Sequence, residues 1–287
     1  MVELLLRAVS KPKAVAAAFL LALAGCETAG VATPDVDPEV FAARQTDLAS
    51  LSAVVERNPR DAEAWNMRGA AYARLGRYDE AIADFNQALA INAGLAKAYS
   101  NRALAFRNLG KLDRALTDYN LALQADPRYA PAYVGRGNIY RQQRHYAQAL
   151  SDFEQAIAVE PQNAQAHHNR GLVYQAQGQH QQAIDEFTIA ISIDVTAAPP
   201  YVARGQSYLA LGDVETALDD YDNAVTLNKD YAEAWIGRAV AFEKKGELEK
   251  ARGSYAQALV LAPKSETAEE GFKRVGGQKG QSYSVAR

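Results

Sequence analysis

The sequence predicts an all-α protein, an α-solenoid built from six helical hairpins with a covering helix at each end. The first observation behind this prediction is a 34-residue pattern that runs six times through residues 62–265, without insertion or deletion. The second is that each copy holds two segments whose small and aromatic residues recur at i, i+4 and i+7, the spacing of one helix face. A single hairpin cannot bury such a face, so the copies must stack on one another.

The composition is that of a protein that buries a core. Hydrophobic residues make up 48% of the 287 residues and charged residues 23%, which is ordinary for a globular chain. The net charge of −3 gives no overall basic field, and we therefore expect no nucleic-acid partner. One cysteine in the whole chain excludes an internal disulfide framework and any zinc site built from several cysteines.

Residues 1–25 differ in character from the rest and are predicted to be a signal peptide. Arg7, Lys11 and Lys13 make the start positive, and residues 14–24 form an uncharged apolar run. Eleven apolar residues are too few for a stable membrane-spanning helix, but they suit the central region of a signal peptide.

The apolar run ends in the sequence LAGC at residues 23–26, which resembles the lipobox of bacterial lipoproteins. The resemblance implies cleavage before Cys26 and acylation of that residue, with a covalent lipid on Cys26 and no other cofactor. It also implies a periplasm-facing protein of the bacterial cell envelope. Glu27, in place of the aspartate that retains such proteins at the inner membrane, favours the outer membrane. The alternative is a lone cysteine buried in an N-terminal helix.

Residues 26–37 are small, polar and interrupted by proline, and we expect a flexible tether there. Residues 38–58 have helical spacing and are predicted to cover the first repeat. Residues 266–275 are predicted to be a second covering helix, capped by Ser265, over the last repeat. The final residues, 276–287, are predicted to be disordered.

Fixed positions within the 34-residue pattern define the two helices of each hairpin. Position 4 is aromatic or histidine, position 8 is glycine or alanine, position 11 is aromatic, and positions 20 and 27 are always alanine. Position 24 is always phenylalanine or tyrosine, and glycine near position 15 can end the first helix in the left-handed conformation. The pattern closely resembles the tetratricopeptide repeat (TPR). Repeat three departs from it because Arg144 replaces the turn glycine, so we expect that turn to be strained or differently closed.

Positions 7 and 23 carry opposite charges through most of the array. This pattern predicts a structural ladder of ion pairs, formed either within each repeat or between neighbouring repeats. A set of arginines that binds a ligand is the less favoured interpretation, because position 7 lies toward the packed side of the helix. The residues are Arg68, Arg102, Arg136, Arg170, Arg204 and Arg238 at position 7, and Asp84, Asp118, Asp152, Glu186 and Asp220 at position 23.

Motifs for catalysis are missing from the sequence. It contains no GxSxG, HExxH or Walker-type loop, and we expect no catalytic site and no metal site. A metal site made from His167 and His168 with His145 or His180 is a weak alternative, because adjacent residues on a helix point in different directions.

Function is therefore expected on the exposed surface of the first helices, at positions 2, 5, 9, 12 and 13. In TPR proteins this surface lines a concave groove that binds peptides. Here it is predicted to be basic and rich in amides in one half and apolar in the other, although ordinary solvated helix faces would look similar. The carboxylate clamp of chaperone-binding TPR proteins is not reproduced. The predicted groove residues are Arg74, Lys97, Arg107, Asn108, Asn138, Arg141, Gln142, Gln175, Val202, Leu209, Ile236 and Val240.

The resemblance to TPR lipoproteins implies a lipid-anchored scaffold or adaptor for protein or peptide partners. Those partners are expected to be acidic or to end in a carboxylate, and cell-wall hydrolases or a protease are the classes that the resemblance suggests. Two alternatives stay open: a structural subunit of an envelope assembly or secretion machine, and an enzyme with an unrecognised site. The sequence leaves the oligomeric state open.

Overall fold

The computed structural model describes residues 38–278 and residue 283, and every regular element among them is an α-helix. Residues 1–37, with the predicted signal peptide, Cys26 and the tether, lie outside the described residues. All the hairpins belong to one compact unit, which begins at Ala43. No described helix is both long enough and apolar enough to cross a membrane.

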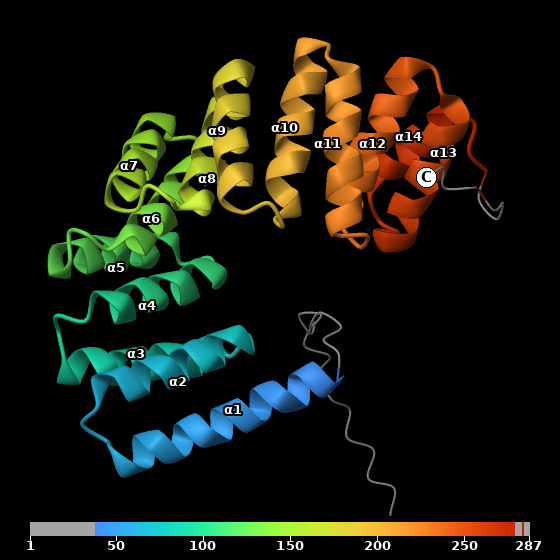
Figure 1. Cartoon of the computed structure of the whole chain (residues 1–287). Coiled ribbons are helices and arrows are strands. Elements are labelled where there is room, and N and C mark those ends of the chain that lie inside the picture. The colour runs from blue at the N-terminus through green and yellow to red at the C-terminus, as the bar shows by residue number, and fades with distance from the viewer. Residues whose placement is uncertain (1–37, 279–282, 284–287) are drawn as a thin grey trace, which may run out of the picture. The chain divides into compact units, whose positions relative to one another are not determined.

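Six hairpins follow the helix α1 in chain order (Figure 1). Each hairpin consists of a first helix and a second helix, joined by a tight turn. The helices are α1 Pro38–Arg57, α2 Ala62–Arg74, α3 Tyr78–Ile91, α4 Ala96–Asn108, α5 Leu112–Ala125, α6 Ala130–Gln142, α7 Tyr146–Val159, α8 Ala164–Ala176, α9 His180–Ile193, α10 Ala198–Leu211, α11 Val214–Leu227, α12 Ala232–Lys245, α13 Leu248–Leu261 and α14 Glu266–Arg274.

The packing order explains which surface the stack presents. The two helices of a hairpin contact each other most extensively, and each second helix also contacts the first helix of the next hairpin. Every first helix from α2 to α12 additionally contacts the next first helix, whereas no two second helices do so among the described elements. The first helices therefore lie closer together and form one continuous surface, which we call the first-helix face.

The core is built from the small and aromatic positions of the pattern. The alanines at positions 20 and 27 are completely buried in all six repeats, and the aromatic residue at position 24 is at most 2% exposed. Small residues allow the two helices of a hairpin to approach closely, and the aromatic ring fills the space beside them. This is why one pattern, copied without a length change, yields one continuous stack.

The turn of repeat three closes in the same way as the others. Arg144 has φ 61°, in the left-handed region, and the five equivalent glycines have φ between 72° and 87°. The His145 amide donates to the Tyr140 carbonyl at 2.8 Å, the hydrogen bond that also closes the glycine turns. The turn is therefore strained at Arg144, because a side chain disfavours this conformation, but its closure is the same.

Helices lie at both ends of the array. In α1, Leu48 and Val55 are buried. In α14, Phe272 is 5% exposed, and the Ser265 hydroxyl accepts a hydrogen bond from the Ala268 amide at 3.3 Å.

Of the final residues, 276–287, the structure describes 276–278 and 283, and the expected disorder of this segment stays a prediction. The Gly277 amide donates to the Phe272 carbonyl at 2.8 Å. The ring of Tyr283 meets the ring of Phe272 edge-on, with centroids 5.3 Å apart, and the Arg252 guanidinium lies 5.7 Å from the centre of the Tyr283 ring. The Tyr283 ring thus contacts one residue of α14 and one of α13.

Candidate binding site

Five of the six arginines at position 7 pair with the acidic residue at position 23 of their own repeat. Arg68, Arg102, Arg136 and Arg204 each donate two hydrogen bonds to the position-23 carboxylate, at 2.7–2.9 Å. Arg170 donates one to Glu186 at 2.6 Å. Each carboxylate is buried, and the side chains of the five paired arginines are only 16–21% exposed.

The same guanidinium groups also reach back to position 25 of the preceding repeat. Arg102 donates to Asn86 and Arg136 to Asn120, both at 2.6 Å, and Arg204 donates to Thr188 at 3.0 Å. Arg238, whose own repeat has Ser254 at position 23, pairs instead with Asp222. The ladder therefore joins residues within repeats and between them, a question that the sequence left open.

These contacts give the position-7 arginines a structural role. Hydrogen bonding to Asp152 raises the pKa of Arg136, and hydrogen bonding to Asp220 raises the pKa of Arg204. Two parallel N–H···O bonds satisfy both the charge and the geometry of a guanidinium. Little of their charge is left over for a ligand.

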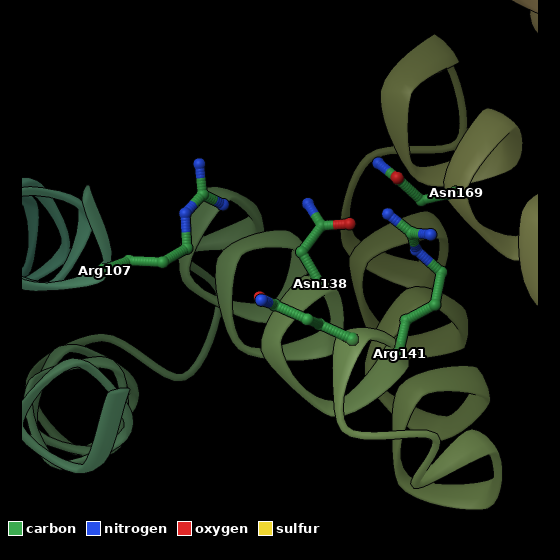
Figure 2. A pocket seen from close by; sticks show the side chains of 5 residues that line it. Arg107, Asn138, Arg141 and Asn169 are labelled. Carbon is green, nitrogen blue, oxygen red and sulfur yellow. The ribbon is translucent and has the colours of Figure 1, made fainter. Parts of the chain in front are cut away.

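A pocket opens on the first-helix face between three successive first helices. It has a volume of about 390 Å³ and is lined by Arg107 of α4, by Asn138, Arg141 and Gln142 of α6, and by Asn169 of α8. Figure 2 shows the Asn138 amide between the two guanidinium groups, with the Asn169 amide just above the Arg141 guanidinium in this view. All five lining side chains are polar, two are cationic, and no acidic residue lines the pocket.

Polar atoms in this pocket lack partners. Neither Arg107 nor Arg141 makes a side-chain hydrogen bond or ion pair with another described residue, and Asn138 Oδ1 and Arg141 Nε are buried without a hydrogen-bond partner. Burial lowers the pKa of Arg141. Burial, helped by the charge of Arg141, also lowers the pKa of His168 on α8 to about 4. A half-buried cation without a carboxylate can bind an anion from outside the chain.

The other predicted residues of the basic half lie outside this pocket. Arg74, Lys97 and Asn108 are exposed on the first helices. Gln175 is engaged within the protein, because its Nε2 donates to the Ala203 carbonyl at 2.8 Å and to the Ser207 hydroxyl at 2.9 Å. Gln175 thus ties α8 to α10.

The predicted apolar half of the groove is wrong at Val202. This side chain is 3% exposed and belongs to the core, and Leu209, Ile236 and Val240 are half-buried against the same cluster. The reason is the orientation of position 5, which faces the packed side of the helix: Asn66, Ser100 and Val134 are buried there too. What remains for solvent on the first-helix face is mostly polar.

Asn169 is the lining residue that sequence reasoning missed. It occupies position 6, where the sequence shows asparagine, glycine, alanine or methionine. Glycine stands there whenever the preceding repeat has tyrosine at position 24: a Cβ atom at Gly135, Gly237 or Gly271 would lie 2.1–2.3 Å from the ring of Tyr119, Tyr221 or Tyr255. Where phenylalanine precedes, as Phe153 precedes Asn169, a larger residue is present. The residue at position 24 of the preceding repeat was therefore the feature of the sequence that could have identified Asn169 as a lining residue.

The histidines do not gather into a metal site. His167 Nδ1 lies 2.9 Å from Glu186 and its Nε2 lies 3.3 Å from the Pro161 carbonyl, while the ring of His168 packs against Phe187. In the described part of the chain, no three histidine, cysteine or acidic residues could hold a metal ion together.

Comparisons with known proteins identify the repeats. Models of the tetratricopeptide repeat match residues 62–94, 96–129, 164–194 and 202–266, and a model described as TPR repeat matches residues 137–178. No curated protein sequence matches the chain significantly.

Several solved structures share the fold. A chain of the APC/C hetero-tetramer Cut9-Hcn1 is 20% identical with a TM-score of 0.73 over 81% of this chain, which spans only 46% of that chain. The pilF protein of Pseudomonas aeruginosa is 20% identical with a TM-score of 0.66, over 73% of this chain and 95% of that one. YrrB, described as a TPR protein with an unusual peptide-binding site, is 25% identical with a TM-score of 0.51, over 66% of this chain and 97% of that one.

The matches and the stack of helices confirm the predicted fold class. With multiple TPR units forming an all-α solenoid, the chain belongs to the tetratricopeptide repeat proteins.

Proposed function

We propose that this protein is a lipid-anchored, periplasm-facing scaffold that binds protein or peptide partners on its first-helix face. The observation that carries the binding role is the pocket with two unpaired arginines, because nothing in the described fold requires their charge. The peptide-binding site named for YrrB, which has the same kind of fold, supports a peptide as the ligand. The role is one of binding rather than catalysis.

The anchoring half of the proposal rests on the sequence around Cys26. The order of positive residues, apolar run, small residues and cysteine supports acylation of the thiol. Several acyl chains would hold the protein firmly, because each buried methylene contributes about 0.8 kcal/mol. The outer membrane is the proposed location.

Metabolic labelling with palmitate tests the anchor. We expect the wild-type chain to take up the label and to fractionate with membranes, and the Cys26→Ser variant to do neither. A wild-type chain that carries no label would contradict the anchoring.

A pull-down from solubilised membranes tests the scaffold. Wild type should retain partner proteins, and the double variant Arg107→Glu, Arg141→Glu should lose them with unchanged helix content. The matched control, Arg60→Glu with Arg128→Glu, makes the same charge change at exposed residues outside the pocket and should retain them. Several substoichiometric partners, with cell-wall hydrolases or a protease among them, fit an adaptor, whereas one stoichiometric complex would instead indicate a subunit of an envelope machine.

A further inference from the structure

The hairpin turns lie along one edge of the array. In every repeat the first helix ends and the second helix begins at the turn, and successive first helices contact each other, so the turns follow one another along this edge. Four cationic side chains at the turns of repeats one to three are exposed. We call them the basic edge: Arg74 at the end of α2, Lys111 and Arg114 around the start of α5, and Arg144 between α6 and α7.

The charges of the basic edge are not used inside the protein. None of the four side chains forms an ion pair or a side-chain hydrogen bond with another described residue. The Arg114 guanidinium lies 5.6 Å from the centre of the Phe106 ring, a contact that leaves the side chain exposed. The acidic residues at these three turns are fewer, and one of them is paired with Arg77 at 2.7 Å: Asp79, Glu80 and Asp113.

The turns of repeats five and six are arranged differently. Lys245 pairs with Glu215 at 2.9 Å and with Glu247 at 3.2 Å, and Lys250 pairs with Glu247 at 2.6 Å. These cations are therefore neutralised within the chain. The second helices α7, α9 and α11 contain acidic residues but no lysine or arginine. An anionic surface is therefore attracted to the basic edge and repelled by these second helices.

Arg144 retains its positive charge at a conformational cost. Its φ of 61° lies in the left-handed region, where the other five repeats have glycine with φ between 72° and 87°. A strained residue persists only where another interaction compensates for it. The Arg144 side chain is exposed and has no partner among the described residues, so no contact within the fold offsets the cost. We attribute the compensation to an interaction outside the chain.

The form of the basic edge favours a broad anionic surface over a protein partner. No large hydrophobic side chain is exposed at the described turns of repeats one to three, whereas the centre of a protein interface is apolar and depleted of charge. The four cations lie on three successive turns, and none of them lines the pocket of the first-helix face. Lipid headgroups present many charges in one plane, and each basic residue near an anionic bilayer strengthens binding about fivefold.

Resting on the proposed lipid anchor, we propose that the basic edge docks on the surface of an anionic phospholipid bilayer and sets the orientation of the array. Residues 26–37 separate Cys26 from α1 and span at most about 40 Å when fully extended, so the anchored chain stays close to the bilayer. The turns of repeats one to three face the headgroups, and the exposed side of α7, α9 and α11 faces away. The contact is electrostatic, so salt weakens it.

Flotation of the full chain with lipid vesicles tests the proposal. One set of vesicles is pure phosphatidylcholine, and the other is an equal mixture of phosphatidylcholine and phosphatidylglycerol. Every chain carries Cys26→Ser, which removes the acyl acceptor, and residues 1–25 contribute equally because they are the same in all. We expect the triple variant Lys111→Gln, Arg114→Gln, Arg144→Gln to bind the anionic vesicles at least about tenfold more weakly than the chain with the native edge, and the neutral vesicles equally.

A matched control removes the same three charges elsewhere. Arg60→Gln, Arg128→Gln and Lys264→Gln lie at exposed sites in the loops between repeats, and the control should bind as the native edge does. High salt should abolish the difference between the control and the basic-edge variant. Equal losses of affinity in the two would mean that only net charge matters, and the proposal would be wrong. Circular dichroism verifies that each variant retains its helix content.

Amine acetylation of the wild-type chain on the same vesicles reports the orientation. Lys111 should be protected on anionic vesicles and should regain its reactivity on neutral vesicles or in high salt. Lys229 and Lys264, which are exposed and lie outside the basic edge, should react equally under all these conditions. Equal reactivity of Lys111 on both kinds of vesicle would overturn the proposed orientation.

The outcomes separate this proposal from the proposed anchor. If the chain takes up no palmitate but the basic-edge variant binds anionic vesicles more weakly, the basic edge stands and the anchoring falls. If wild type is acylated but the basic-edge variant binds anionic vesicles as the native edge does, the anchoring stands and the docking surface falls. A basic-edge variant that keeps its vesicle binding but loses its pull-down partners would assign the edge to an acidic protein and overturn the proposal.

Discussion

Arg136 and Arg141 lie on the same helix, α6, but their guanidinium groups have different surroundings. Arg136 faces the second helix of its hairpin, where Asp152 accepts two hydrogen bonds from it and Asn120 of the preceding repeat accepts a third. Arg141, on the first-helix face, is half-buried among amides with no carboxylate near it. Hydrogen bonding raises the pKa of the first guanidinium, and burial lowers the pKa of the second.

The comparison shows that two residues of the same type on one helix can have different roles. The charge of Arg136 is used inside the protein, where it joins two helices and two repeats. Arg141 forms no ion pair with another described residue, so its guanidinium can still interact with a ligand. Changes that remove the partner of one arginine, or the other arginine itself, should therefore have very different effects on stability.

The largest expected effect comes from Asp152→Ala, which leaves Arg136 partly buried without its carboxylate. We expect the free energy of unfolding in urea to fall by about 3 kcal/mol, the loss typical of breaking a buried ion pair on one side. Arg141→Met should change it by less than about 0.5 kcal/mol. If both variants lost the same free energy of unfolding, the two arginines would not differ in their structural roles, and this account would be wrong.

A second effect follows from His168 beside Arg141. Its pKa of about 4 in the folded chain is below the ordinary value of 6.5, so the folded state favours the neutral ring. As the pH falls from 6.5 toward 4, the unfolded chain takes up a proton at His168 that the folded chain does not. The free energy of unfolding is therefore unaffected above pH 6.5 and decreases below it, by about 3 kcal/mol in total. Urea unfolding at several pH values should show this loss in wild type, and a smaller one in His168→Gln.

Arg141→Gln sharpens the same measurement. Removing the neighbouring charge should raise the pKa of His168, because the charge of Arg141 disfavours a second cation nearby. Titration of the histidine ring signals follows this directly. An unchanged His168 pKa would mean that burial alone holds it low.

The smallest effect concerns Arg144, a third arginine of the same hairpin, whose cost lies in the backbone. Arg144→Gly should raise the free energy of unfolding by about 1 kcal/mol, because glycine adopts the left-handed conformation without steric cost. Gly178→Arg, at the equivalent turn of repeat four with open space around it, should lower it by a similar amount. Opposite signs in thermal unfolding support this account, and matching signs refute it.

The sequence predicts the hairpins well because the repeat fixes one face of each helix. Alanine at positions 20 and 27 of every copy predicts a close helix contact, and those alanines are completely buried. It could not place the ladder fully, because the partner at position 25 of the preceding repeat changes from asparagine at Asn86 and Asn120 to Thr188 and Asp222. The contact between Tyr283 and Phe272 could not be predicted from the repeat pattern, because Tyr283 lies outside the repeats.

The pocket was predictable only in part. The repeat frame places Asn138 and Arg141 on the surface of the first helices. It does not show that Gln175 is tied to α10 by hydrogen bonds, or that Val202 is buried, because both depend on how the next repeat packs. Contacts between copies, rather than the pattern within one copy, decide which side chains stay available.

The pairing of tyrosine with glycine across neighbouring repeats means that the six units are not interchangeable parts. Deleting repeat three, residues 130–163, would bring Asn169 against Tyr119, whose ring accepts only a glycine opposite it. Deleting repeat four, residues 164–197, would bring Ala203 against Phe153, a combination like that of Phe187 with Ala203 in the native array. Shuffling, duplication or loss of whole units can therefore proceed at some junctions of this chain and is blocked at others.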